Sequence, residues 1–559
     1  MPSNFYRARP SKVNLPEAEA GRAVNQCTKS SVVVEFRPLN NWDGEFGFDW
    51  LRLTEAEARD IEQSYIRNAD NQVVAFSPNN PTFGLVESGF ATVKKDLDDA
   101  KAQKKIQKEY KTFSISDKGR VSQSRHLTYY VPYLNLYPQA GLSPLKALTK
   151  GLTEYATTEP RPCEAKLRMI ADIKGQSPES IEIEFNNKDF AITLNIADAE
   201  TEIDGEITSL KIPVPKNYTP TPDTAATSRK LVAGAIELIV TITCLRSLSS
   251  NKEINVYAYH EQDSTKLNKK AREDLEKINK QHNKANPGDP NDPTTVILTN
   301  QKLAGKLIVL QNDAHKQKEL NVILIIVQTE VDVGATKKGS YHSSELKKLS
   351  NVLHHALVHP RLITKLNSSE IVLDLTSDNN FKKVLPDATK PRGLNNGYYI
   401  YPSGKININE ASFSDYIYDK FINTEIKTGK TITKPYQNLT RANGYFLVFS
   451  FADKALNGSV IGNVLIDKSK NFLKSVALYG NLDRANNLSN VFAHEAYHGI
   501  QLRHTHRDET PLKHPNCKYI FPHRGYGIML ATSNIMSYNA GTYAYSTWHW
   551  QWEIMQKNV

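Results

Sequence analysis

The chain has 559 residues, of which 39% are hydrophobic, and a formal net charge of +10. This length predicts several domains rather than one core, and the apolar share is ordinary for a globular protein. No run of eighteen apolar residues appears, so no membrane span is predicted. The positive charge is diffuse and interleaved with acids, as in 94–111, so nucleic-acid binding is not indicated.

Residues 1–333 are predicted to be β-rich. Short apolar strands at the spacing of a β-sandwich are predicted in the middle of this part, at 165–173, 180–185 and 190–196. Pro- and Thr-rich residues follow as a linker. We therefore expect an N-terminal β-rich domain, a sandwich-like module and a third β-rich module with a basic helical insertion at 264–293. The boundaries that we expect are 1–158, 159–222 and 223–333.

From residue 334 to residue 559 the pattern changes to alternating helices and strands. Leucines at helical spacing predict a helix over 345–358. Strands are predicted at 368–377, 397–404, 444–452 and 475–480, and a further helix is predicted at 485–502. The fold class that we expect is multidomain, with sandwich-like β-modules followed by a C-terminal α/β domain.

The last predicted helix carries the sequence AHEAYHGIQLRH at 493–504. Its histidines His494 and His498 are four residues apart, which places both imidazoles on one helical face, within reach of one ion. A catalytic zinc ion takes three protein ligands, and His504 supplies a third if the chain turns after about residue 500. Glu495, beside the first histidine, can then act as a general base.

This segment resembles the metzincin signature HExxHxxGxxH, with Gln501 where that signature has glycine. Gln501 then requires either an uncommon positive φ angle or a different bend, placed at Gly499. His506 and Asp508 remain alternative third ligands. Further along, SNIMSY at 533–538 is similar to the metzincin Met-turn, in which Met536 would form a hydrophobic floor beneath the histidines.

The resemblance implies a zinc-dependent endopeptidase that hydrolyses amide bonds of a protein or peptide substrate, with His494, His498 and His504 as zinc ligands and Glu495 as base. It also implies that Tyr538 ligates zinc or stabilises the developing oxyanion. A tyrosine that only packs in the wall is the alternative. The aromatic segment at 541–555 either packs a helix against the core, the interpretation that we favour, or shapes a pocket.

Two segments, 35–52 and 547–555, are similar to parts of effector-like proteins of Bacteroidota and their type VI secretion apparatus. The first residues contain no apolar segment of the kind that makes a secretory signal peptide. We therefore expect synthesis in the cytoplasm and export as a toxin, with a secretion-apparatus component and an immunity protein as partners. An inactive multidomain binding or adhesion protein and an intracellular housekeeping peptidase are the alternatives.

Overall fold

The protein is described by a computed structural model. The described residues are 31–39, 41–50, 86–87, 108–117, 125–155, 159–174, 177–214, 236–260, 300–332, 334–383, 399–401, 403–408, 412–455, 460–481, 490–505, 519–520, 534–536 and 546–559. Within them the chain is rich in β-strands, which form several sheets, and has four α-helices. The expectation of β-rich modules is confirmed. The basic insertion predicted at 264–293 lies outside the described residues.

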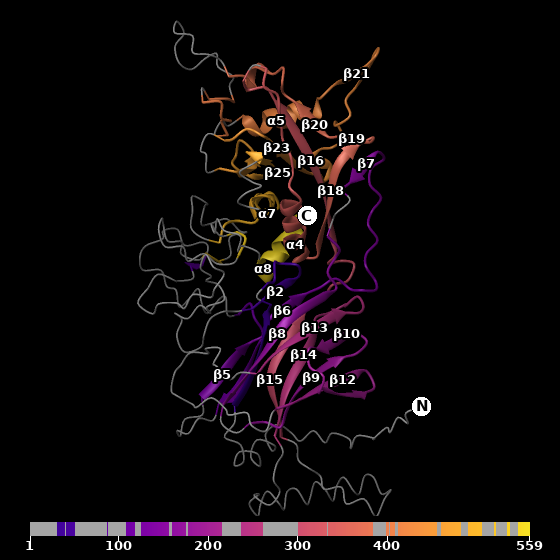
Figure 1. Ribbon diagram of the computed structural model, residues 1–559, viewed down its shortest axis with the longest axis vertical. Helices are drawn as coiled ribbons and strands as arrows, with labels where there is room; N and C mark the ends of the chain where they lie inside the picture. The colour runs from indigo at the N-terminus through magenta and orange to yellow at the C-terminus, as the bar shows by residue number, and fades with distance from the viewer. Residues whose placement is uncertain are drawn as a thin grey trace, which may run out of the picture.

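Two sheets pack face to face in the lower half of Figure 1. The smaller sheet has the order β1 (Ser31–Pro38), β8 (Glu164–Lys174), β13 (Ile236–Cys244) and β10 (Phe190–Leu194). The larger sheet has the order β11 (Glu200–Asp204), β12 (Ile207–Pro213), β9 (Ser180–Asn186), β14 (Lys252–His260), β15 (Asn300–Val309), β6 (Tyr133–Asn135) and β2 (Gly47–Asp49). Alternate residues such as Val34, Leu167, Ile183 and Val256 fill the core between them, as in a sandwich.

A third sheet occupies the upper half of Figure 1. Its main path is β19 (Ser369–Glu370), β18 (Val358–Leu366), β16 (Lys318–Thr329), β23 (Phe446–Ser450), β25 (Phe472–Leu478) and β24 (Gly462–Ile466), while β7 (Leu152–Glu154), β17 (Lys337–Lys338) and β20 (Val372–Asp374) pair beside it. Strands β18, β16, β23 and β25 are mutually parallel, and β24 is antiparallel to β25.

Helices cover both faces of this third sheet. Helices α4 (Ser343–His354), α7 (Asn490–Gly499) and α8 (His549–Asn558) share one core with Val322 of β16. Helix α5 (Phe413–Ile422) packs on the opposite face, in the core that contains Ile323. Strand β16 is thus buried on both faces, which explains its nearly continuous apolar sequence.

Smaller elements complete the described chain. The antiparallel strand pairs are β4 (Thr112–Asp117) with β5 (Arg125–Tyr130), β21 (Ile426–Thr428) with β22 (Thr431–Thr433), and β3 (Val86–Glu87) with β26 (Tyr519–Ile520). The short 3-10 helices are η3 (Asn379–Phe381) and η4 (Arg441–Asn443). Among the described residues no helix is long and apolar enough to cross a membrane.

The sheets group the strands differently from the four segments that we expected. Strand β9, from segment 159–222, lies beside β14, from segment 223–333. Strands β7 and β16, from the first and third segments, belong to the sheet of the fourth. Strand spacing along the sequence predicts that a strand forms, whereas its sheet is chosen by side-chain packing with distant partners.

Three predicted elements differ in extent. The helix expected over 345–358 ends at His354, because Leu357 adopts a positive φ of 55° and strand β18 begins at Val358. The strand expected at 368–377 is divided into β19 and β20, which pair with different neighbours. Of the strand expected at 397–404, the described part forms only an isolated bridge, between Ile400 and Ile406.

Candidate metal centre

Helix α7 carries the first two histidines and packs closely against the third sheet. A Cβ atom at Gly499 would stand 2.5 Å from the Phe446 ring of β23, which means that the helix backbone touches the sheet directly. A Cβ atom at Gly462 of β24 would meet Val491 of the helix at 2.8 Å. Two glycines, one on each side of the contact, therefore fix the depth at which α7 packs.

The chain turns after α7 at Gln501, whose φ angle is +74°. The Leu502 N–H donates to the Tyr497 carbonyl at 2.9 Å, and the Gln501 N–H donates to the His498 carbonyl at 2.8 Å. These two bonds, together with the left-handed conformation of Gln501, are those of a Schellman helix end. The first of the two alternatives for Gln501, a positive φ angle, is therefore confirmed, and Gly499 remains helical.

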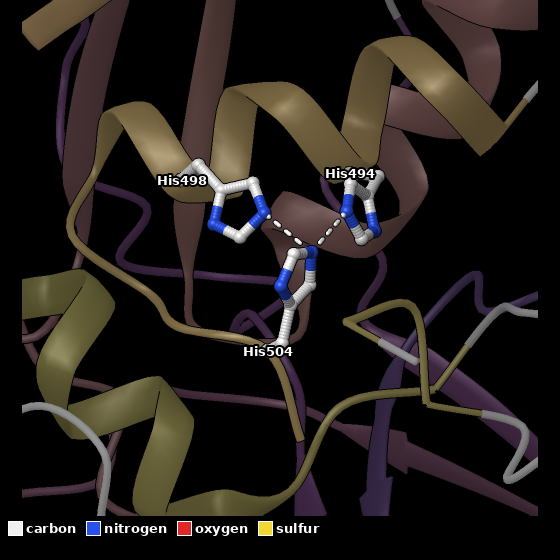
Figure 2. A group of neighbouring side chains, drawn as sticks. All are labelled: His494, His498 and His504. Carbon is white, nitrogen blue, oxygen red and sulfur yellow. Dashed lines mark hydrogen bonds between the residues drawn. The ribbon is translucent and has the colours of Figure 1, made fainter. Parts of the chain in front are cut away.

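The turn brings His504 back to the two helical histidines (Figure 2). Its Nε2 lies 3.0 Å from His494 Nε2 and 2.9 Å from His498 Nε2. The ligand atoms of the three residues all lie within 4.8 Å of one another, and this group of three could hold a metal ion. The sequence spacing and the geometry thus bring the same three residues together.

Backbone carbonyls determine which ring nitrogens carry protons. His494 Nδ1 lies 2.7 Å from the Ile535 carbonyl oxygen, and His498 Nδ1 lies 2.8 Å from the Leu502 carbonyl oxygen. A carbonyl oxygen only accepts, so both Nδ1 atoms must donate, and in the neutral rings both Nε2 atoms are acceptors that carry a lone pair. Metal-ligating histidines are oriented in this way by their second ring nitrogen.

The three converging nitrogens fit a cation better than they fit one another. One proton on His504 Nε2 can be directed fully at only one of its two neighbours, so only one of the two short contacts can be a well-aligned hydrogen bond. Ligand nitrogens of a tetrahedral zinc ion stand ~3.3 Å apart, since Zn–N bonds are about 2.0–2.1 Å. The two contacts of His504 Nε2, at 3.0 and 2.9 Å, would have to lengthen by a few tenths of an ångström to reach this spacing. Burial, with His504 and His494 nearby, also holds the pKa of His498 well below its usual range.

Glu495 lies on the same helix and contacts the end strand of the sheet. Its Oε2 accepts a hydrogen bond of 2.8 Å from the Val464 N–H of β24. Burial raises the pKa of the Glu495 carboxyl, whereas His494 and the Val464 N–H lower it. The carboxylate is thus oriented by backbone and remains beside the histidine cluster without being one of its three members.

The segment predicted to form the Met-turn supports the cluster through its backbone. Ile535 accepts from His494, and the fully buried Met536 accepts from the Thr505 N–H, one residue after His504, at 3.1 Å. The C-terminal aromatics Trp548, Trp550 and Trp552 are also buried in the core shared with α7. For the described part of 541–555, the favoured prediction of core packing is confirmed.

Other predicted residues are not placed. Tyr538, His506 and Asp508 lie outside the described residues. Conversely, sequence reasoning missed Val464 and Phe472, both of which contact site residues from strands of the third sheet. Neither belongs to a motif, and only the fold reveals them.

Comparisons with known proteins do not assign the chain to a family. No protein-family model matches the sequence, and no curated protein matches it. Among solved structures, the collagen-binding domain of the Erysipelothrix rhusiopathiae surface protein RspB is similar over 36% of this chain and 59% of that chain, less than two thirds of its length. The sequence identity is 8% and the TM-score is 0.11, which carries no argument about fold or function.

Proposed function

We propose that the protein is a zinc-dependent endopeptidase of the metzincin type. The observation that carries the proposal is the convergence of three Nε2 atoms, from His494, His498 and His504, of which the first two belong to rings whose Nδ1 atoms donate to backbone carbonyls. These three residues would hold the zinc ion. When bound, zinc supplies a Lewis acid that lowers the pKa of water and polarises a carbonyl.

Glu495 is the general base in this proposal. Its carboxylate accepts the proton that the attacking water loses, and it later delivers that proton to the leaving amine, so that one amide and one water become an acid and an amine. The raised pKa that burial gives Glu495 makes it a stronger base, and the hydrogen bond from the Val464 N–H keeps it oriented. Tyr538 is proposed to ligate zinc or to stabilise the developing oxyanion.

Strand β24 supports a polypeptide as the substrate. It ends the main path of the third sheet and, among the described strands, pairs only with β25. An extended peptide can add to such an edge through main-chain hydrogen bonds. Because the Val464 N–H of this strand contacts Glu495, a peptide lying along β24 passes directly beside the proposed base.

Zinc binding and cleavage test this proposal together. The purified protein should contain one zinc ion per chain and cleave casein, and a chelator should abolish cleavage until zinc is restored. In His504→Ala the zinc content should fall, because two imidazoles remain. The matched control is His315→Ala, since His315 is exposed and lies outside the cluster. If the wild-type protein binds no zinc, the proposal is wrong and a binding or adhesion protein becomes the better account.

A further inference from the structure

Gln501 occupies a backbone conformation that normally favours glycine. A non-glycine residue at φ +74° is less stable than glycine there, because its Cβ atom lies too close to the following carbonyl oxygen. Something else in the fold must offset this cost. The side chain of Gln501 offers the offset, because its Nε2 donates a hydrogen bond of 2.8 Å to the Phe472 carbonyl oxygen of β25.

Phe472 also meets two other residues of the same bend through its ring. The ring centroid lies 4.9 Å from that of His498, and the Arg503 guanidinium carbon stands 3.7 Å above the ring. This guanidinium position is that of a cation–π contact, and Arg503 is buried. Phe472 is therefore held by residues before, within and after the turn.

The contacts constrain His504 from one side. His504 follows Arg503 directly and is one residue from Thr505, whose N–H is held from the other side by the Met536 carbonyl. Leu502, between Gln501 and Arg503, is fully buried and accepts from His498 Nδ1. The segment that delivers His504 is thus held by contacts of Gln501, Leu502 and the Arg503 side chain, and again by the Thr505 backbone.

We infer that Gln501 and Phe472 are positioning residues for the third imidazole. The hydrogen bond from the Gln501 side chain to Phe472 fixes the turn that places His504, and a glycine at position 501 would fix that turn less rigidly. The Phe472 clamp, made of Phe472 with His498, Gln501 and Arg503, holds the histidine segment against β25. The inference rests on the proposed function, since it assigns the clamp a role in holding zinc.

Substitutions at Gln501 separate the backbone effect from the side-chain effect. Gln501→Gly removes the side-chain bond and relieves the backbone strain. Lys470→Gly is the matched control, because Lys470 is exposed, also has a positive φ of 62° and lies in the turn just before β25. Phe472→Leu removes both ring contacts while keeping the carbonyl acceptor.

Zinc affinity is measured by competition with a chromophoric chelator, and the cobalt(II) derivative reports ligand geometry by its visible absorption. Loss of an outer partner typically weakens metal affinity by 10–100-fold, so we expect about a tenfold loss in Gln501→Gly and Phe472→Leu, with an altered cobalt spectrum. Lys470→Gly should bind zinc as the wild type does.

Wild-type zinc affinity and an unchanged cobalt spectrum in Gln501→Gly would overturn the inference and leave the proposed function intact. Absence of zinc from the wild type would instead remove the proposed function itself. Urea unfolding of the metal-free variants tests whether weaker zinc binding is caused by a general loss of stability. Gln501→Gly should unfold at a midpoint close to that of the wild type.

Discussion

At the scale of single residues, the candidate site divides into groups that the sequence reveals and groups that it conceals. His494, Glu495, His498 and His504 were predicted because ligand spacing is a local property of one helix and the turn after it. Val464 and Phe472 could not be predicted, since each reaches the site from a strand about thirty residues away. Gln501 falls between these groups. Its positive φ angle was one of the two alternatives that we predicted, whereas the hydrogen bond of its side chain was not predicted.

The role proposed for Glu495 predicts that metal binding and cleavage can be separated. In Glu495→Gln the amide oxygen can still accept from the Val464 N–H, so the fold and the zinc content should be retained. Casein cleavage should fall by at least about 100-fold, because general base catalysis contributes roughly 10²–10⁴. Zinc analysis and a peptidase assay on the same preparation check this. Retained cleavage would show that another group takes the proton.

At the scale of elements, the strongly apolar strands were predictable and their partners were not. The predictions at 444–452 and 475–480 overlap β23 and β25, because buried parallel strands are short apolar runs. The helix expected at 485–502 is described from residue 490 and ends at Gly499. Its end was harder to predict, since helical spacing continues into the turn that Gln501 makes.

The close contact between α7 and β23 predicts the effect of Gly499→Ala. Alanine favours a helix over glycine by about 1 kcal/mol, so this change would stabilise a helix with open space beside it. Here the added Cβ would stand 2.5 Å from Phe446, and we expect a loss of about 1–3 kcal/mol in the free energy of unfolding. Urea denaturation measures it. An increase in stability would mean that α7 does not lie against Phe446.

At the scale of the whole molecule, the sandwich and the third sheet are joined by buried polar contacts. The His355 Nε2 lies 2.7 Å from the Gly44 carbonyl oxygen and its Nδ1 lies 2.8 Å from the Thr547 hydroxyl. Asp49 of β2 accepts from the backbone N–H of His549, at the start of α8, at 2.9 Å. Such contacts between distant segments cannot be predicted from one sequence, because no local pattern encodes them.

The shared strands predict that residues 334–559 do not fold alone. This segment lacks β16, which pairs with β18, β20 and β23, and it lacks β7, which pairs with β18. Without β16 the buried faces of its neighbours are exposed and the sheet is interrupted. Circular dichroism and urea titration should show no cooperative transition for 334–559. A sharp transition at a wild-type midpoint would show that the third sheet can form without these strands.

The buried histidines near the junction predict a loss of stability in mild acid. Burial lowers the pKa of His355 to about 3 and that of His359 to about 4, below the unfolded value of 6.5. Their contribution to the free energy of unfolding is complete above pH 6.5 and is lost as the pH falls below that value. At pH 5 the loss is about 2 kcal/mol for each histidine. Urea unfolding at pH 7.5 and 5.0, in chelator, measures the change.

In His359→Gln the acid-induced loss of stability should shrink, because one titrating group is removed. In His315→Gln the loss should equal that of the wild type, since His315 is exposed. Stability that stays constant or rises between pH 7.5 and 5.0 would contradict the burial of neutral histidines at this junction.

X-ray absorption at the zinc edge tests the central claim most directly, because it reports the ligands without depending on a substrate. The account predicts one zinc ion per chain with three imidazole nitrogens at about 2.0–2.1 Å, reduced to two imidazoles in His504→Ala. A protein without zinc, or a zinc ion whose imidazole count is unchanged by His504→Ala, would contradict it.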